Sequence, residues 1–331
     1  MIPVTVVSGF LGSGKTTLIR SLLGDPACAD AALIVNEFGE AGIDHHLFRK
    51  TDERTTLVRG GCACCARRDD LADALRDLLD RLDRREVAFD RVVIETSGLA
   101  DPAPILHTLV ADPVLRHRCR ADRLVVTLDA VAGEANLDRH AEAVRQVTAA
   151  DVVVLTKRDL APPTAEDRLR RRVADLNPAA QVLAAEHGRA EAAALVGPPL
   201  VVCADRPAPG PADGSADHLA ASDIRSATLV FDKPLDWQML GVWLTLLLHR
   251  HGERVLRVKG LLDVGPGSGP LLLEGVQHVV HAPRHLPAWP DPDRRSRIVL
   301  ITRGLDPERL RDSLLAFQDG VGESGSREVG E

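Results

Sequence analysis

Residues 9–16, GFLGSGKT, decide the fold of this chain, because they fit the pattern G-x-x-x-x-G-K-[ST]. The apolar, β-branched run Ile2–Val7 before them predicts a buried strand. Thr16–Leu23 after them predicts a helix with an apolar stripe. A glycine-rich turn between a strand and a helix is the setting in which this pattern forms a phosphate-binding loop, the P-loop. We therefore expect an α/β nucleotide-binding domain.

The P-loop also predicts how phosphate and its metal ion are bound. Backbone amides in the glycine-rich turn and at the helix start would face the phosphate oxygens. Lys15 is expected to reach the β- and γ-phosphates, and the Thr16 hydroxyl to bind Mg²⁺. The predicted nucleotide-binding residues of this loop are Gly9, Gly12, Ser13, Gly14, Lys15, Thr16 and Thr17.

A second acidic position follows the predicted strand Arg91–Ile94, in the sequence ETSGLADP at 95–102. A carboxylate at the end of a strand in a P-loop domain suits Mg²⁺, often held through water. We therefore predict Thr16 and Glu95 as magnesium ligands, and Lys15, Thr16 and Glu95 as the catalytic residues. Gly98 is expected to bring its backbone amide near the γ-phosphate.

The sequence TKRD at 156–159 follows the predicted strand Val152–Leu155 and resembles the guanine-reading pattern N-K-x-D, with Thr in place of Asn. Asp159 would accept both N–H groups of the guanine edge, a bidentate pairing that adenine does not offer. Lys157 would pack its stem along the base. We predict Thr156, Lys157 and Asp159 as base-binding residues. The missing Asn amide weakens the expected preference for guanine.

The sequence NEFGEAGID at 36–44 is acidic and interrupted by glycine, which suits a switch loop that senses the γ-phosphate. Glu37, Glu40 and Asp44 are its expected contacts to Mg²⁺, water or metal.

Three cysteines within four positions, Cys62, Cys64 and Cys65, predict a transition-metal site. They follow the predicted strand Thr56–Val58 and precede the predicted helix Asp69–Leu82. Three thiolates leave one coordination position open, which suits a metal that must be handed on. We expect zinc, while cobalt, nickel and iron stay open because affinity order rather than ligand type separates them. Buried apolar cysteines and a redox thiol cluster are the alternatives.

The composition is that of a globular protein, with 331 residues, 27% charged and 45% hydrophobic. The net charge of −7 (41 basic against 48 acidic residues) does not favour a nucleic-acid partner. No apolar run reaches the length of a membrane span, and the start MIPVTVV has no basic region typical of a signal peptide. We expect a cytoplasmic protein that binds neither nucleic acid nor membrane.

Up to about residue 202, short apolar runs alternate with amphipathic stretches, which predicts a mostly parallel sheet with helices on both faces. Further strands are expected at Ala32–Val35, Arg123–Leu128 and Gln181–Leu183, and further helices at Ala103–Leu109, Arg139–Val147 and Ala165–Leu176.

A flexible linker is expected at 203–224, where Pro, Ala, Gly and Asp are frequent. Residues 225–318 predict a smaller α+β domain with a helix-backed sheet, and 319–331 a disordered tail. Its expected elements are strands at Ala227–Phe231, Arg254–Val264, Leu271–Leu273, Val276–Val280 and Arg297–Thr302, and helices at Trp237–Leu248 and after Asp306 to about Phe317.

Together these motifs resemble the CobW-type metal-chaperone GTPases, a branch of the P-loop class that also holds the nickel-insertion GTPases. The likeness extends to RVKGLL at 257–262, GVQHVVH at 275–281 and RIVLITRGLD at 297–306, which look like that family's C-terminal domain. The resemblance implies GTP hydrolysis coupled to delivery of a transition metal to a client metalloprotein, with C-x-C-C as the metal site. It leaves a homodimer open. Many members carry a His-rich loop before or within the second domain, where this chain has only His218.

Three other functions fit parts of the pattern. The first is a small-molecule kinase or ATPase on the same P-loop, which a preference for guanine over adenine nucleotides would exclude. The second is a non-enzymatic metal buffer, which GTP turnover dependent on Lys15 would exclude. The third is a thiol redox sensor, which retention of metal under reducing conditions, with no disulfide on mild oxidation, would exclude.

Overall fold

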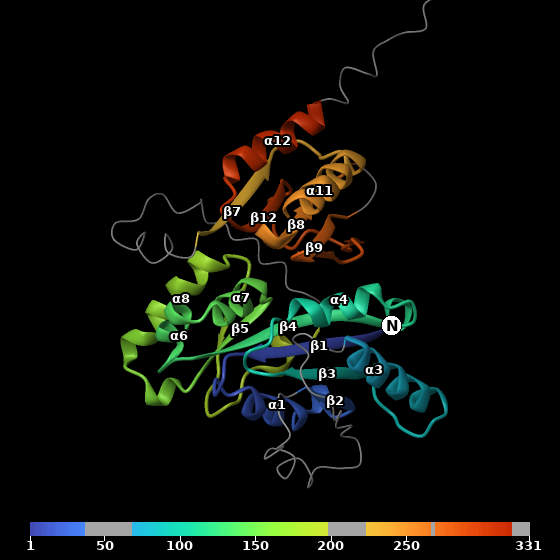
Figure 1. Ribbon diagram of the computed structural model, residues 1–331, viewed down its shortest axis with the longest axis vertical. Coiled ribbons are helices and arrows are strands. Elements are labelled where there is room, and N and C mark those ends of the chain that lie inside the picture. The colour runs from blue at the N-terminus through green and yellow to red at the C-terminus, as the bar shows by residue number, and fades with distance from the viewer. Residues whose placement is uncertain (37–67, 198–222, 266–268, 320–331) are drawn as a thin grey trace, which may run out of the picture. The chain divides into compact units, whose positions relative to one another are not determined.

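The computed structural model describes residues 1–36, 68–197, 223–265 and 269–319, which form two compact units (Figure 1). The strands of the first unit are β1 (Ile2–Gly9), β2 (Ala31–Asn36), β3 (Arg91–Thr96), β4 (Cys119–Asp129), β5 (Val152–Thr156) and β6 (Gln181–Ala184). They form one sheet in the order β2-β3-β1-β4-β5-β6, and every neighbouring pair is parallel. The predicted α/β fold with a mostly parallel sheet is confirmed.

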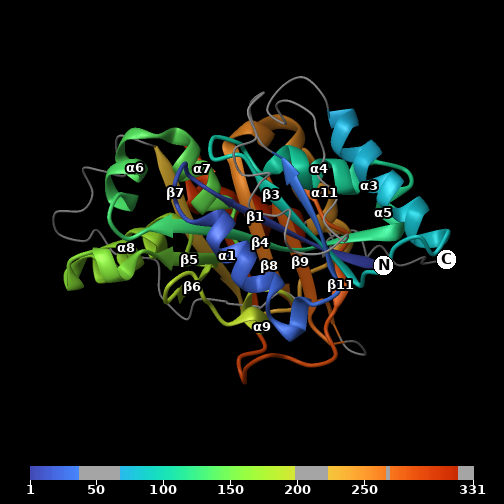
Figure 2. The same ribbon diagram turned by 90° about the horizontal axis from the view of Figure 1, so that it is seen from below.

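Helices cover both faces of this sheet. They are α1 (Lys15–Leu23), α3 (Arg68–Asp83), α4 (Ala103–Ala111), α5 (Leu115–Arg118), α6 (Gly133–Arg139), α7 (Ala141–Ala149), α8 (Pro163–Leu176) and α9 (Ala192–Leu195), with 3-10 turns η1 (Pro26–Cys28) and η2 (Arg158–Leu160). One face packs on α1 through Leu18, Ile19 and Leu22. In Figure 1, α4 and α7 lie on the opposite side of the sheet from α1, and in Figure 2 α1 lies in front of it.

The central strand β1 explains why the P-loop lies where it does. Val4 and Val6 are fully buried, as expected for a strand with helices on both faces. The connection from β1 passes through α1 to one side of the sheet, and β4 pairs on the other side of β1 from β3. Ligands of open α/β sheets bind at the carboxyl ends of the strands where the strand order reverses. The P-loop follows β1 at this position.

The second unit is an antiparallel sheet backed by two helices. Its elements are β7 (Ile224–Phe231), α11 (Trp237–His251), η3 (Gly252–Arg254), β8 (Val255–Leu262), β9 (Leu271–Val276), β10 (Val279–Val280), β11 (Arg284–His285), β12 (Ser296–Arg303) and α12 (Pro307–Asp319). The strand order is β10-β9-β8-β12-β7, with β11 paired to β9. This sheet with its two helices confirms the predicted α+β character.

The core of the second unit forms between one face of the sheet and the two helices. Leu240, Trp243 and Leu247 of α11 pack with Leu310 and Leu314 of α12 over the inner side chains of β7, β8, β9 and β12. Trp243 is 3% exposed, and its indole N–H donates to Ser313 Oγ at 3.1 Å. All three tryptophans of the chain, at 237, 243 and 289, belong to this unit, and the chain has no tyrosine.

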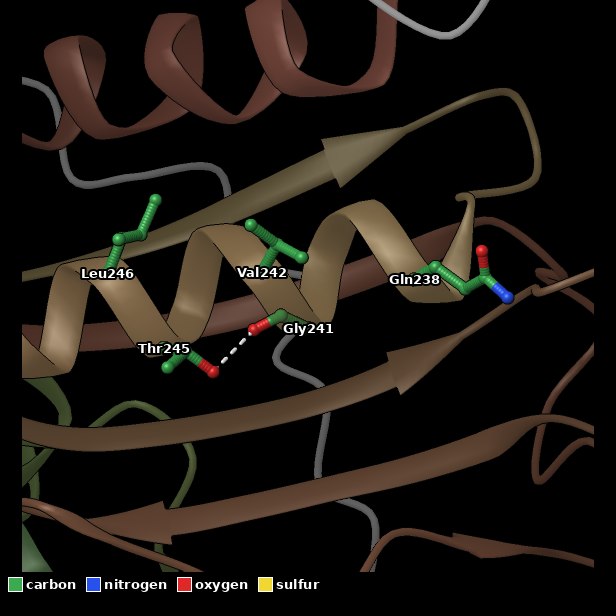
Figure 3. A pocket seen from close by; sticks show the side chains of 5 residues that line it. All are labelled: Gln238, Gly241, Val242, Thr245 and Leu246. Carbon is green, nitrogen blue, oxygen red and sulfur yellow. Dashed lines mark hydrogen bonds between the residues drawn. The ribbon is translucent and has the colours of Figure 1, made fainter.

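The outer face of α11 is apolar and exposed. Val242 is 46% and Leu246 52% exposed, and together with Gln238, Gly241 and Thr245 they line an open pocket, whose side chains are drawn in Figure 3. No helix among the described residues is long and apolar enough to cross a membrane.

Two predicted elements differ from the structure. Arg139–Val147 is not one helix, because α6 ends at Arg139 and α7 begins at Ala141, with an extended residue, His140, between them (φ −126°, ψ 110°). Val276–Val280 is not one strand, because β9 ends at Val276 and the chain turns back to β10 through Gln277, whose φ is 52°. The predicted strand Thr56–Val58, most of the linker and most of the tail lie outside the described residues.

Candidate nucleotide site

The P-loop connects the end of β1 to the first turn of α1, as predicted. Gly9 requires glycine, because its φ is 141° and a Cβ there would lie 2.6 Å from Thr127 O on β4. The loop closes on itself where Ser13 N–H donates to Phe10 O at 3.1 Å. Gly12 and Gly14 also have positive φ. The backbone of residues 9–14 is therefore a tight turn that opens into the positive end of a helix.

The side chain of Thr16, in the first turn of α1, contacts the strand next to β1. Thr16 Oγ1 donates to Glu95 Oε1 at 2.7 Å, although the two residues are 79 positions apart. Glu95 is 2% exposed at the end of β3. A hydroxyl and a carboxylate oxygen at this separation are hard ligands that suit Mg²⁺. The two predicted magnesium ligands are thus adjacent.

Lys15 folds back onto its own loop. Its ammonium group donates to Gly9 O at 3.0 Å and to Phe10 O at 3.3 Å. Both acceptors are backbone carbonyls of the P-loop, so the charge already lies over the turn that the sequence predicts to hold phosphate.

The residues predicted to bind the base lie at the end of β5. Thr156 Oγ1 donates to Ser13 O at 2.7 Å, which ties this strand to the P-loop. Lys157 adopts a left-handed backbone (φ 54°) and forms an ion pair of 2.6 Å with Asp129. Asp159 follows in η2 and is exposed. The structure therefore brings Thr156 to the P-loop and leaves the Asp159 carboxylate open to solvent.

Three polar residues of this region were not predicted. Thr127 on β4 hydrogen-bonds Ser13 Oγ at 2.6 Å, Asp129 at the end of β4 pairs with Lys157, and Gln146 on α7 donates to the backbone of the segment after β3. Asp129 carried a usable signal, because it is a carboxylate directly after a predicted strand. Thr127 and Gln146 had no such signal in the sequence. A single polar residue within an apolar pattern does not indicate which distant loop its side chain contacts.

The predicted switch residues Glu37, Glu40 and Asp44 and the metal ligands Cys62, Cys64 and Cys65 lie outside the described residues. The described residues before and after this segment belong to a strand and a helix. Asn36 closes β2 in register with Thr96 of β3, next to Glu95, and α3 begins at Arg68. Within residues 1–36, 68–197, 223–265 and 269–319, no cluster of three or more His, Cys, Asp or Glu side chains has the geometry of a metal site.

The two described cysteines are poor metal ligands. Burial raises the pKa of Cys28 to about 11 and that of Cys119 to about 11. Both side chains are almost fully covered. With pKa values this high, both thiols stay protonated near neutral pH. Because the thiolate rather than the thiol binds metal, neither residue is suited to hold a metal ion.

Comparison with known proteins gives matches along both units. Residues 3–184 match the model of the CobW/HypB/UreG nucleotide-binding domain, and 224–318 match the cobalamin synthesis protein CobW C-terminal domain. The zinc chaperone YjiA of Escherichia coli is 34% identical over 94% of this chain and 96% of its own. The zinc chaperone CobW of Pseudomonas aeruginosa is 29% identical over 95% of this chain and 90% of its own.

Two solved structures agree with this chain over nearly its whole length. The Zn(II)-bound YjiA GTPase from E. coli is 32% identical and has a TM-score of 0.71, covering 96% of this chain and 98% of that chain. A Zn(II)-bound triple mutant of YjiA GTPase, with one glutamate and two cysteines replaced by alanine, gives the same TM-score of 0.71 at 30% identity, covering 96% of this chain and 99% of that chain.

Proposed function

The chain belongs to the CobW/HypB/UreG family of nucleotide-binding GTPases, and from this premise we propose that it hydrolyses GTP to control the binding of zinc and its transfer to a client protein. The observation that carries the proposal is the match to a protein named a zinc chaperone over 94% of this chain and 96% of that protein. Because the match spans both units, it is more than a likeness between P-loops.

In this proposal the P-loop holds the phosphates. Lys15 moves its ammonium group from Gly9 O and Phe10 O to the β- and γ-phosphates, while backbone amides of the turn bind the remaining oxygens. The Thr16 hydroxyl and the Glu95 carboxylate hold Mg²⁺, which when bound neutralises charge on the phosphate oxygens. The adjacency of these two oxygen ligands supports that assignment. Intrinsic turnover is slow, as in GTPases that await a partner.

Zinc is the cargo, and we propose Cys62, Cys64 and Cys65 as its ligands. Glu37, Glu40 and Asp44 belong to the segment between β2 and α3 that also carries these cysteines. Asn36, the last residue of β2, pairs in register with Thr96, next to Glu95. Because one segment carries both sets of residues, a rearrangement of its acidic part on binding the γ-phosphate would also shift the positions of the three cysteines. Each nucleotide state would then have its own zinc affinity.

The proposal is tested by a zinc titration against a chromophoric chelator, with a GTP analogue and Mg²⁺, with GDP, and without nucleotide. We expect the tightest zinc binding with the GTP analogue. The coupling should be about 1–3 kcal/mol, or roughly 5–150-fold in affinity, and zinc should raise the affinity for the analogue by the same factor. Equal zinc affinities in all three conditions would contradict nucleotide control, and absence of GTP turnover by the wild-type protein would contradict the enzymatic part.

A preference for guanine is expected to depend on Asp159. Asp159→Ala should weaken GTP binding by about 10–100-fold, the cost of losing hydrogen bonds to a charged group, and leave ATP binding nearly unchanged. Competition of GTP and ATP for a fluorescent nucleotide measures both. Asp167→Ala is the matched control, because Asp167 is an exposed carboxylate on α8, eight positions after Asp159 in the chain, and its removal changes the charge equally. Equal competition by ATP and GTP in the wild-type protein would refute the assignment.

A further inference from the structure

The segment Ser97–Pro102 connects the end of β3, and thus Glu95, to the start of α4. Gly98 lies so close to the P-loop that a Cβ would be 2.8 Å from the Cα of Leu11. The segment forms a turn in which Ala100 N–H donates to Ser97 O at 3.2 Å. Its position therefore decides which backbone groups face the phosphate end of the site.

The other side of this turn is held by one side chain, Gln146 of α7. Its amide nitrogen donates to Gly98 O and to Ala100 O, both at 3.1 Å. Gln146 is 1% exposed. Both bonds join residues more than 45 positions apart in the chain, so they fix the turn to a helix that belongs to a different part of the fold. Arg145 on the same helix lies 3.7 Å from Asp101 at the end of the turn.

The two carbonyl acceptors determine which end of the amide faces the turn, because only the NH₂ group can donate. None of the described residues donates to the Gln146 Oε1 atom, although that oxygen is buried. An unsatisfied buried oxygen is costly, so an apolar residue would be the better choice for packing alone. The amide is thus explained by its two donated bonds.

Those bonds determine the direction of a peptide group. A peptide is planar and trans, so fixing the direction of Gly98 O also fixes the direction of Leu99 N–H on its opposite side. The helix α7 is itself connected to the P-loop at its start, because the His140 ring stacks on Phe10 with 4.5 Å between ring centroids. One helix therefore contacts both the P-loop and the turn after β3.

We propose that Gln146 is a positioning residue that holds the Gly98–Ala100 turn in the arrangement in which the site distinguishes GTP from GDP. The inference rests on the proposed function, since it concerns hydrolysis at the same site. Without the two bonds the turn would move away from the P-loop, and backbone groups near the γ-phosphate would lose their alignment. GDP has no γ-phosphate, so its binding does not depend on Gln146.

The test compares Gln146→Met, which keeps an unbranched side chain of similar length but cannot donate, with the wild-type protein. We expect kcat for GTP hydrolysis to fall at least about tenfold, as for small misplacements of catalytic groups. Affinity for a GTP analogue should fall while affinity for GDP is kept. Gln146→Asn, with the amide on a shorter stem, should lie between the two proteins and decides the question if the Met variant does not fold.

Thr108→Val is the matched control, because Thr108 is buried on α4 and its hydroxyl donates to Pro104 O of the same helix, with no other partner among the described residues. It should keep both kcat and the ratio of the two nucleotide affinities. Wild-type kcat and ratio in the Gln146 variants would overturn the inference, as would equal losses for GTP analogue and GDP, which indicate only a structural role. A wild-type protein without turnover would instead contradict the proposed function.

Discussion

Lys15→Ala should reduce GTP hydrolysis by at least about 10²–10³-fold, the usual cost of removing one group that stabilises charge in a transition state. The Lys15 ammonium already lies on the P-loop carbonyls of Gly9 and Phe10, so alanine removes a charge positioned at the phosphate end of the site. The negative charge that builds up on the transferred phosphoryl group would then lose its main cationic partner from the protein. Phosphate release under saturating GTP and Mg²⁺ measures the effect.

The matched control for this variant is Lys233→Ala, which removes the same charge from an exposed position in the second unit. It should hydrolyse GTP at the wild-type rate. Thermal unfolding of both variants checks that the Lys15 variant is folded. A folded Lys15→Ala protein with wild-type turnover would show that the P-loop is not the catalytic site.

Replacing Cys62, Cys64 and Cys65 together with serine should abolish the difference in zinc affinity between the GTP and GDP states and leave GTP binding nearly intact. Serine keeps the size of the side chain but offers no thiolate, the ligand that zinc prefers. In the wild-type protein zinc must displace the thiol protons, so binding releases protons and weakens as the pH falls. Chelator competition at several pH values measures both effects.

The control variant is Cys28→Ala with Cys119→Ala, because both of these thiols are buried and protonated near neutral pH. It should keep the nucleotide-dependent zinc affinity. The deciding quantity is the ratio of zinc affinities in the two nucleotide states. A serine variant that keeps the wild-type ratio would exclude the three cysteines as the coupled site.

The sequence predicted the central strands of the first unit because they are buried between helices and contain a run of apolar residues, as Val152–Leu155 of β5 does. The prediction of one helix over Arg139–Val147 was wrong at His140, because the amphipathic pattern continues there although the helix is interrupted. The break coincides with the stack of the His140 ring on Phe10, a contact between residues 130 positions apart that no local pattern contains. It failed again at Gln277, because a left-handed turn residue is expected to be Gly or Asn.

Contacts within the candidate site were predictable where a short motif implies its own geometry. Thr16 and Glu95 could be paired from sequence, because a P-loop and a strand-end carboxylate meet at the same edge of a parallel sheet. Gln146 could not, since its role depends on a distant turn reaching α7. The same holds for the contact of Thr127 with Ser13, which depends on β4 pairing beside β1.

The location of the tryptophans allows the unfolding of the two units to be followed by two different spectroscopic signals. The nucleotide-binding unit contains neither tryptophan nor tyrosine among all its residues, whereas Trp243 is buried in the core of the other unit. Tryptophan emission therefore reports the melting of the C-terminal unit alone, while circular dichroism reports both. A lag between the two signals on heating would resolve the separate stabilities of the units, which a single transition temperature would hide.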